Sequence, residues 1–100
     1  MKNYLIFSLL LLTACVSFTG ESGADRTLTN DVMRQIKLFE LADNCKSIQS
    51  VHREIIASDP QANAQNELWT VKACGQDNKY TVSMRTDGKN GVFFNVGREK

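Results

Sequence analysis

The sequence predicts an α+β fold in which one N-terminal helix packs on a small antiparallel β-meander of three to four strands. Two observations support this prediction. Apolar residues recur with helical spacing between residues 28 and 42, and three runs of alternating apolar and polar residues follow in the last third of the chain. The helical stripe is the natural cover for the apolar face of the meander. We therefore expect one small α+β domain over residues 28–100.

The helix is predicted from an apolar stripe whose members recur at spacings of four, four and three residues: Leu28, Val32, Ile36 and Phe39. The stripe is expected to be widened by Leu38, Leu41 and Ala42, with Arg34, Lys37 and Glu40 on other faces. We expect an N-cap at Thr29 or Asn30 and a helix end at Asp43–Asn44.

Residues 46–57 fit two interpretations. The spacing of Ile48, Val51, Ile55 and Ile56 is compatible with a second helix. The segment from Ser50 to Ile56 is also rich in β-branched residues and would suit a strand. Asp59–Pro60 is expected to end the element in either case.

The C-terminal strands are predicted from three period-two runs separated by turn-forming sequences. Their apolar positions are Trp69, Val71 and Ala73, then Tyr80, Val82 and Met84, then Val92, Phe94 and Val96. The two hairpin loops are expected at residues 75–78 and 87–91.

The first fourteen residues have the layout of a secretory signal, with Lys2 before the apolar run from Leu5 to Leu12. This run is too short to cross about 30 Å of hydrocarbon as a finished transmembrane helix. The signal ends in Leu12-Thr13-Ala14-Cys15, which resembles the lipobox of bacterial lipoproteins. The resemblance implies that residues 1–14 are a signal peptide and that Cys15 is lipidated and becomes the new N-terminus.

The same resemblance implies a lipid-anchored protein of the bacterial cell envelope. Val16 after the cysteine, in place of Asp, implies sorting to the periplasmic face of the outer membrane. The alternative is an ordinary signal peptide cut further along the chain, for example after Ala24. Residues 16–26 are polar and show no apolar periodicity, so we expect residues 15–27 to be the lipidated cysteine followed by a flexible linker.

Cys45 and Cys74 remain as an even pair, which in an exported protein predicts a disulfide. A loop of 29 residues would be closed. Strict alternation from Trp69 points Cys74 away from the helix, so we expect a bulge at Cys74–Gly75. With His52 as the single histidine, no ligand spacing for zinc is present.

A second resemblance concerns the segment from Trp69 to Val82. Its pattern Trp-x-Val-x-x-Cys-Gly, followed by a turn and Tyr-x-Val, is similar to a strand motif of small uncharacterised exported bacterial proteins, including envelope lipoproteins. Those proteins carry an upstream cysteine at a helix end, which Cys45 would match, followed by a strand. The resemblance therefore favours a strand at residues 50–56, and it implies no activity.

Charge and motifs exclude several function classes. Residues 15–71 carry five basic and eight acidic side chains, and residues 72–100 carry six basic and three acidic ones. No concentrated basic excess of the kind found in nucleic-acid-binding proteins is present. The chain also lacks a Gly-x-Ser-x-Gly motif, a Gly-rich phosphate loop and a Cys-x-x-Cys pair. We therefore expect no enzyme, no catalytic residues, no cofactor and no metal, and no small-molecule substrate is indicated.

A binding surface is the better prediction. If Trp69 and its alternating neighbours face the helix, one opposite face carries two apolar residues and two cations: Leu68, Lys72, Arg85 and Phe93. The sequence thus predicts a lipid-anchored envelope protein that acts as a non-catalytic binding or structural module with an envelope protein partner. The alternative is an inhibitor or exclusion factor that binds a periplasmic or surface protein.

Overall fold

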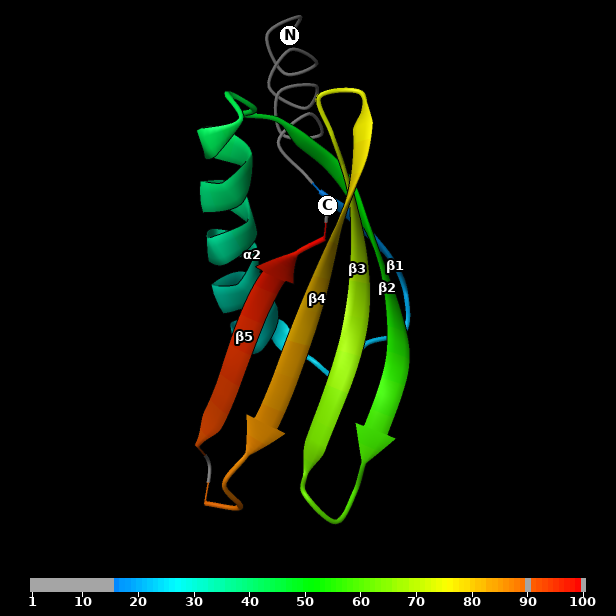
Figure 1. Cartoon of the computed structure of the whole chain (residues 1–100), viewed down its shortest axis with the longest axis vertical. Coiled ribbons are helices and arrows are strands. Elements are labelled where there is room, and N and C mark those ends of the chain that lie inside the picture. The colour runs from blue at the N-terminus through cyan, green and yellow to red at the C-terminus, as the bar shows by residue number, and fades with distance from the viewer. Residues whose placement is uncertain (1–15, 90, 100) are drawn as a thin grey trace, which may run out of the picture.

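The computed structural model describes residues 16–89 and 91–99. Its described part contains one helix, α2 (Arg26–Ala42), and a five-stranded mixed sheet in the order β1-β2-β3-β4-β5 (Figure 1). The strands are β1 (Ser17–Gly20), β2 (Ile48–Asp59), β3 (Ala64–Ala73), β4 (Gln76–Thr86) and β5 (Val92–Arg98). The α+β class and the antiparallel meander from β2 to β5 are confirmed. The strand count is higher than predicted, because β1 adds to β2 in parallel.

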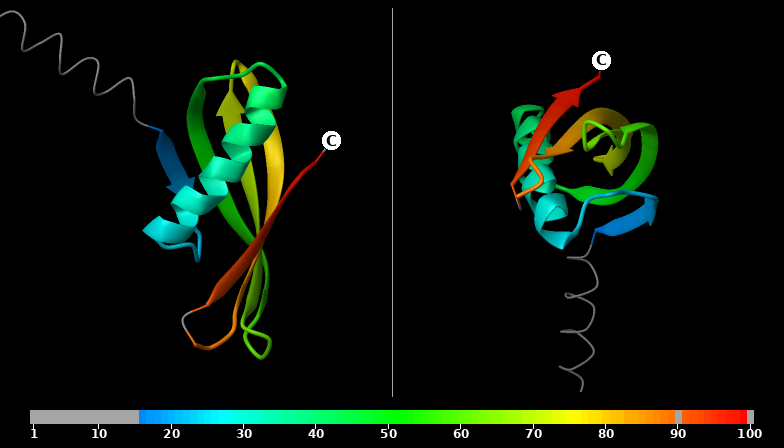
Figure 2. Two further views of the ribbon diagram at one scale, coloured as in Figure 1. Left: turned by 90° about the vertical axis from the view of Figure 1, so that its left-hand side faces the viewer. Right: turned by 90° about the horizontal axis from the view of Figure 1, so that it is seen from below.

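The sheet curls around a core, and α2 lies in the gap between the edge strands β5 and β1 (Figure 2). The helix contributes Val32, Met33 and Ile36 to this core. The concave face of the sheet contributes the alternate residues of its central strands: Val51, Trp69, Val71, Ala73, Tyr80, Val82 and Met84. All six predicted apolar positions of the first two runs are thus buried, whereas in the third run Phe94 and Val96 are partly buried and Val92 is 46% exposed.

The helix begins earlier than predicted. Its N-cap is Asp25, whose carboxylate accepts a hydrogen bond from the backbone N–H of Leu28 at 2.8 Å. The predicted caps Thr29 and Asn30 are wrong and lie inside the helix. Asp25 is the N-cap because its side chain accepts a hydrogen bond from one of the backbone N–H groups that the first turn leaves unpaired.

The buried side of α2 is narrower than predicted. Leu38 and Leu41, expected to widen the apolar stripe, are 62% and 49% exposed, and Ala42, expected to do the same, is exposed as well. Glu40, expected on an outer face, is buried. The sheet covers only the sector around Val32 and Ile36, and Glu40 lies next to that sector, whereas the two leucines do not.

The segment that the sequence left open is a strand, β2, and it ends at Asp59 as expected. The linker predicted for residues 15–27 is wrong for residues 17–20, which form β1 and pair with residues 50–53 of β2. The guanidinium of Arg53 lies over the ring of Phe18 at 4.9 Å and over that of Trp69 at 5.3 Å. This cation–π contact attaches β1 to the core.

The disulfide between Cys45 and Cys74 is confirmed, with Cα atoms 6.1 Å apart. Cys74 and Gly75 have φ values of 51° and 77°, so both residues are left-handed and form the two-residue turn between β3 and β4. The predicted bulge is not needed, because the strand ends at Ala73 and its alternation no longer orients Cys74. The predicted loop at residues 75–78 is too long, since Gln76–Asn78 belong to β4.

Candidate functional site at the open end of the sheet

The predicted patch of Leu68, Lys72, Arg85 and Phe93 is only partly assembled. All four lie on the convex face, where Leu68 and Lys72 alternate with fully buried residues of β3. Arg85 and Phe93 are direct cross-strand partners on β4 and β5, and Phe93 is 64% exposed. Leu68 is half-buried further along the sheet. Lys72 pairs with Asp77, eight residues from Arg85 along β4 and therefore on the order of 26 Å away.

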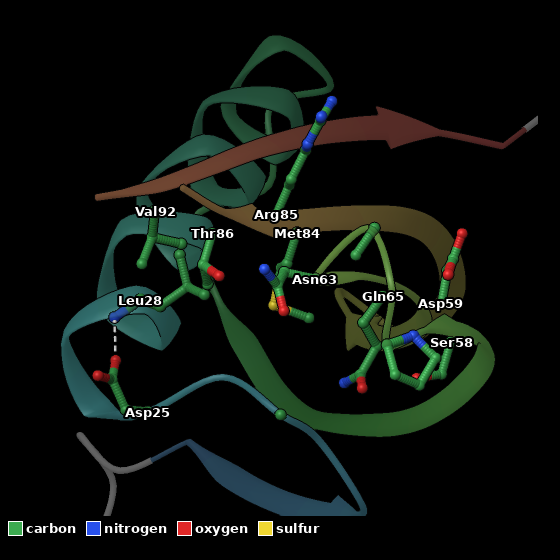
Figure 3. Close-up of a pocket in the computed structure, with 13 residues that line it drawn as sticks. Asp25, Leu28, Ser58, Asp59, Asn63, Gln65, Met84, Arg85, Thr86 and Val92 are labelled. Carbon is green, nitrogen blue, oxygen red and sulfur yellow. Dashed lines mark hydrogen bonds between the residues drawn. The ribbon is translucent and has the colours of Figure 1, made fainter. Parts of the chain in front are cut away.

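Of the Arg85–Phe93 pair, Arg85 borders a hollow of about 450 Å³ at the end of the sheet that carries the β2–β3 and β4–β5 turns (Figure 3). Phe93 lines a neighbouring hollow that also includes Arg85 and Thr86. We call the first hollow and this pair the open end. Its apolar walls are formed by Leu28, Pro60, Met84 and Val92, and its polar walls include Asn63, Gln65 and Thr86. Arg85 extends away from the hollow in Figure 3, so it lies on the outer rim.

One wall of the hollow is fixed by a buried carboxylate. Glu67 is fully buried and accepts hydrogen bonds from Gln65 Nε2 at 2.7 Å and Trp69 Nε1 at 2.8 Å. It also accepts from the backbone N–H of Gly23 at 2.6 Å and from Ser22 Oγ at 2.5 Å. Glu67 therefore joins β3 to the segment between β1 and α2, and it orients Gln65 at the hollow.

Asp87 stabilises the turn between β4 and β5, which lies at the same end of the sheet. Its carboxylate accepts hydrogen bonds from the backbone N–H groups of Lys89 at 2.7 Å and Gly91 at 2.9 Å. These bonds favour the ionised carboxylate and lower the pKa of Asp87 below its ordinary value. The turn that Asp87 closes leads directly into Val92 and Phe93 and so positions both residues at the open end.

The other buried carboxylate lies at the far end of α2 and is structural. Glu40 accepts hydrogen bonds from Asn78 Nδ2 at 3.0 and 3.1 Å and from the hydroxyl of Tyr80. Burial and the neighbouring Glu40 carboxylate raise the pKa of the Tyr80 hydroxyl above its ordinary value. Arg98 pairs with Asp43 and lies 3.9 Å from Glu40, so the charge of this carboxylate is partly compensated.

The open end offers both apolar and polar contacts to a partner. Its walls combine aliphatic side chains, which can pack against an apolar side chain of a partner, with amide and hydroxyl groups and the carboxylates of Asp25 and Asp59. Within residues 16–89 and 91–99, no group of three or more His, Cys, Asp or Glu side chains is placed to hold a metal ion. His52 lies elsewhere, exposed on the convex face and hydrogen-bonded to Thr19 Oγ1.

The positions of Glu67 and Gln65 at the hollow could have been predicted from the alternation along β3, but were not. Glu67 has the same strand parity as Trp69, which places it on the buried face. Gln65 has the same parity again and reaches the hollow. A carboxylate on the core side of a strand indicates a buried hydrogen-bond network, because an unpaired buried charge would be too costly.

Cys15, the predicted lipidation site, lies outside the described residues. In the part of the chain that is described, no helix is long and apolar enough to span a bilayer. Comparison of the chain with protein-family models, curated proteins and solved structures finds no match.

Proposed function

We propose that this protein is a lipid-anchored component of the bacterial cell envelope, at the periplasmic face of the outer membrane, and that it acts as a non-catalytic binding module. The lipobox-like run ending at Cys15 supports the anchor. The Arg85–Phe93 pair beside the hollow supports the binding role, since exposed aromatic and arginine side chains are enriched in protein interfaces. The partner is an envelope protein that presents an apolar segment.

The observation that carries the proposal is the position of Val16. This residue shares a hollow with Leu41 and Lys46 at the end of the molecule remote from the open end. Ser17 pairs with Ser50, nine residues before the end of β2, which corresponds to about 30 Å of strand. A lipid on the residue preceding Val16 would leave the open end pointing away from the bilayer and accessible to a partner.

The anchor is tested by intact-mass analysis of protein extracted from membranes, with and without reductant. We expect a chain that begins at Cys15 and carries fatty acyl groups. We also expect reductant to add the mass of two hydrogen atoms, from the Cys45–Cys74 disulfide. A soluble, unacylated product that begins beyond residue 15 would refute the proposal.

The binding role predicts that Arg85→Glu combined with Phe93→Ser abolishes recovery of a partner while leaving the stability within about 0.5 kcal/mol, because both side chains are exposed. The measurement is affinity purification from solubilised envelopes, together with urea unfolding. Lys72→Glu is the matched control, since it reverses a charge on the same face outside the open end. Equal partner recovery from the double variant and the control would exclude the open end.

A further inference from the structure

A hollow remote from the open end is lined by Val16, the first described residue. Val16 is half-buried and packs against the core, and it lines this hollow of about 340 Å³ together with Lys37, Leu41 and Lys46. The next four residues form β1 and are hydrogen-bonded to β2. Residue 15, the predicted lipid site, is bonded directly to Val16. No flexible spacer separates the predicted lipid site from the folded domain.

Beside this hollow, α2 presents two large apolar side chains to solvent. Leu38 is 62% exposed and Leu41 is 49% exposed. Their spacing of three residues places them on one side of the helix, next to Lys37. We call Val16, Lys37, Leu38, Leu41 and Lys46 the Val16 face.

The charge of this face is positive. Neither Lys37 nor Lys46 is paired with a carboxylate of the described residues. Two acidic groups lie close by. Glu40 also lines the hollow but is buried and bonded to Tyr80 and Asn78, and Asp43 pairs with Arg98. Exposed leucines flanked by unpaired lysines have the composition of a surface that lies in a membrane interface.

We infer that the Val16 face rests on the anionic bilayer to which the chain is anchored, with Leu38 and Leu41 entering the interfacial region and Lys37 and Lys46 contacting lipid phosphates. This inference rests on the proposed lipid anchor at Cys15. A linker of a dozen residues would leave the domain free to tumble, whereas β1 removes this freedom. The acyl chains retain the protein at the membrane, and the Val16 face fixes its orientation so that the open end points outward.

The inference is tested by tryptophan quenching with the acylated chain in vesicles of phosphatidylethanolamine and phosphatidylglycerol whose acyl chains are brominated. Leu41→Trp reports on the Val16 face. Ile56→Trp is the matched control, because Ile56 is 53% exposed and lies in the distal half of β2. The native Trp69 is fully buried and contributes the same background to every variant.

We expect the brominated lipid to quench the emission of Leu41→Trp at least twofold more than that of Ile56→Trp, which should match the parent protein. Leu38→Trp should behave as Leu41→Trp and provides a second reporter. Adding Lys37→Glu and Lys46→Glu to Leu41→Trp should return its quenching to the level of the control, since each lysine near an anionic surface shifts the equilibrium about fivefold.

The outcomes separate the inference from the proposed function. Flotation of the vesicles and the intact mass report on the anchor alone, and a chain that neither floats nor carries acyl groups would overturn both. A chain that is acylated and floats, but in which the tryptophans at positions 41 and 56 are quenched equally, would overturn only the fixed orientation. Unchanged quenching after the two lysine substitutions would overturn the contact with lipid phosphates.

Discussion

Glu67→Ala is expected to lower the free energy of unfolding by about 2–6 kcal/mol, a large share of the ~5–15 kcal/mol that stabilises a small domain. The substitution removes the acceptor of four hydrogen bonds in a fully buried site. Ser22 and Gln65 can rotate toward solvent, but Trp69 Nε1 and the backbone N–H of Gly23 cannot. Each buried donor left without a partner costs about 1–3 kcal/mol.

Urea unfolding followed by the fluorescence of Trp69 measures this loss. Glu54→Ala is the control, because Glu54 is an exposed glutamate of the same sheet and its removal should change the stability by no more than about 0.5 kcal/mol. Glu67→Gln keeps one acceptor oxygen but turns an amide donor toward the other donors, so we expect an intermediate loss. If Glu67→Ala and Glu54→Ala unfold alike, the network does not hold the segment between β1 and α2.

The part of the fold that was predictable depends on local patterns. The stripe around Val32 and Ile36 identified the helix, and the alternation around Trp69 and Tyr80 identified the meander. Both patterns report on burial of a face that a single element creates by itself. The disulfide was predicted on a different basis, from the even number of remaining cysteines and from the inferred export of the protein.

The first strand was not predictable, because its stability comes from distant residues. The segment from Ser17 to Gly20 has no run of β-branched residues, and it pairs with a strand that begins about thirty residues later in the chain. It is attached by the cation–π contact of Arg53 with Phe18 and by the hydrogen bonds of Glu67. From sequence alone, a polar segment of this kind is predicted to be a linker, because the residues of β2 and β3 that hold it are not known to lie near it.

The face of the sheet that carries the site was predictable, but the positions of its residues along the strands were not. Alternation correctly put Arg85 and Lys72 on the same side of the sheet. It carries no information on separation along the strands, and the register of β3 with β4 puts the two cations at opposite ends. On α2, the predicted apolar stripe included Leu38 and Leu41, but the sheet covers a narrower sector of the helix and leaves both exposed. Glu40 is buried instead, because Asn78 and Tyr80 donate hydrogen bonds to its carboxylate.

Removal of the disulfide by Cys45→Ala with Cys74→Ala is expected to lower the free energy of unfolding by about 3–4 kcal/mol. The bond closes a loop of 29 residues, and releasing it returns the corresponding chain entropy to the unfolded state. It also frees the junction between α2 and β2 from the β3–β4 turn. Alanine adds no new strain at position 74, since cysteine already holds the left-handed conformation there.

Urea unfolding of the parent protein in reductant provides the control for this prediction. Its stability should fall to that of the double variant within about 1 kcal/mol, and reductant should leave the double variant unchanged. The loss should appear as a lower midpoint of unfolding together with a steeper dependence of the free energy on urea, because the unfolded state without the cross-link exposes more surface. A double variant that unfolds at the urea concentration of the oxidised parent would show that the helix, the sheet and the buried carboxylates hold the domain without the disulfide.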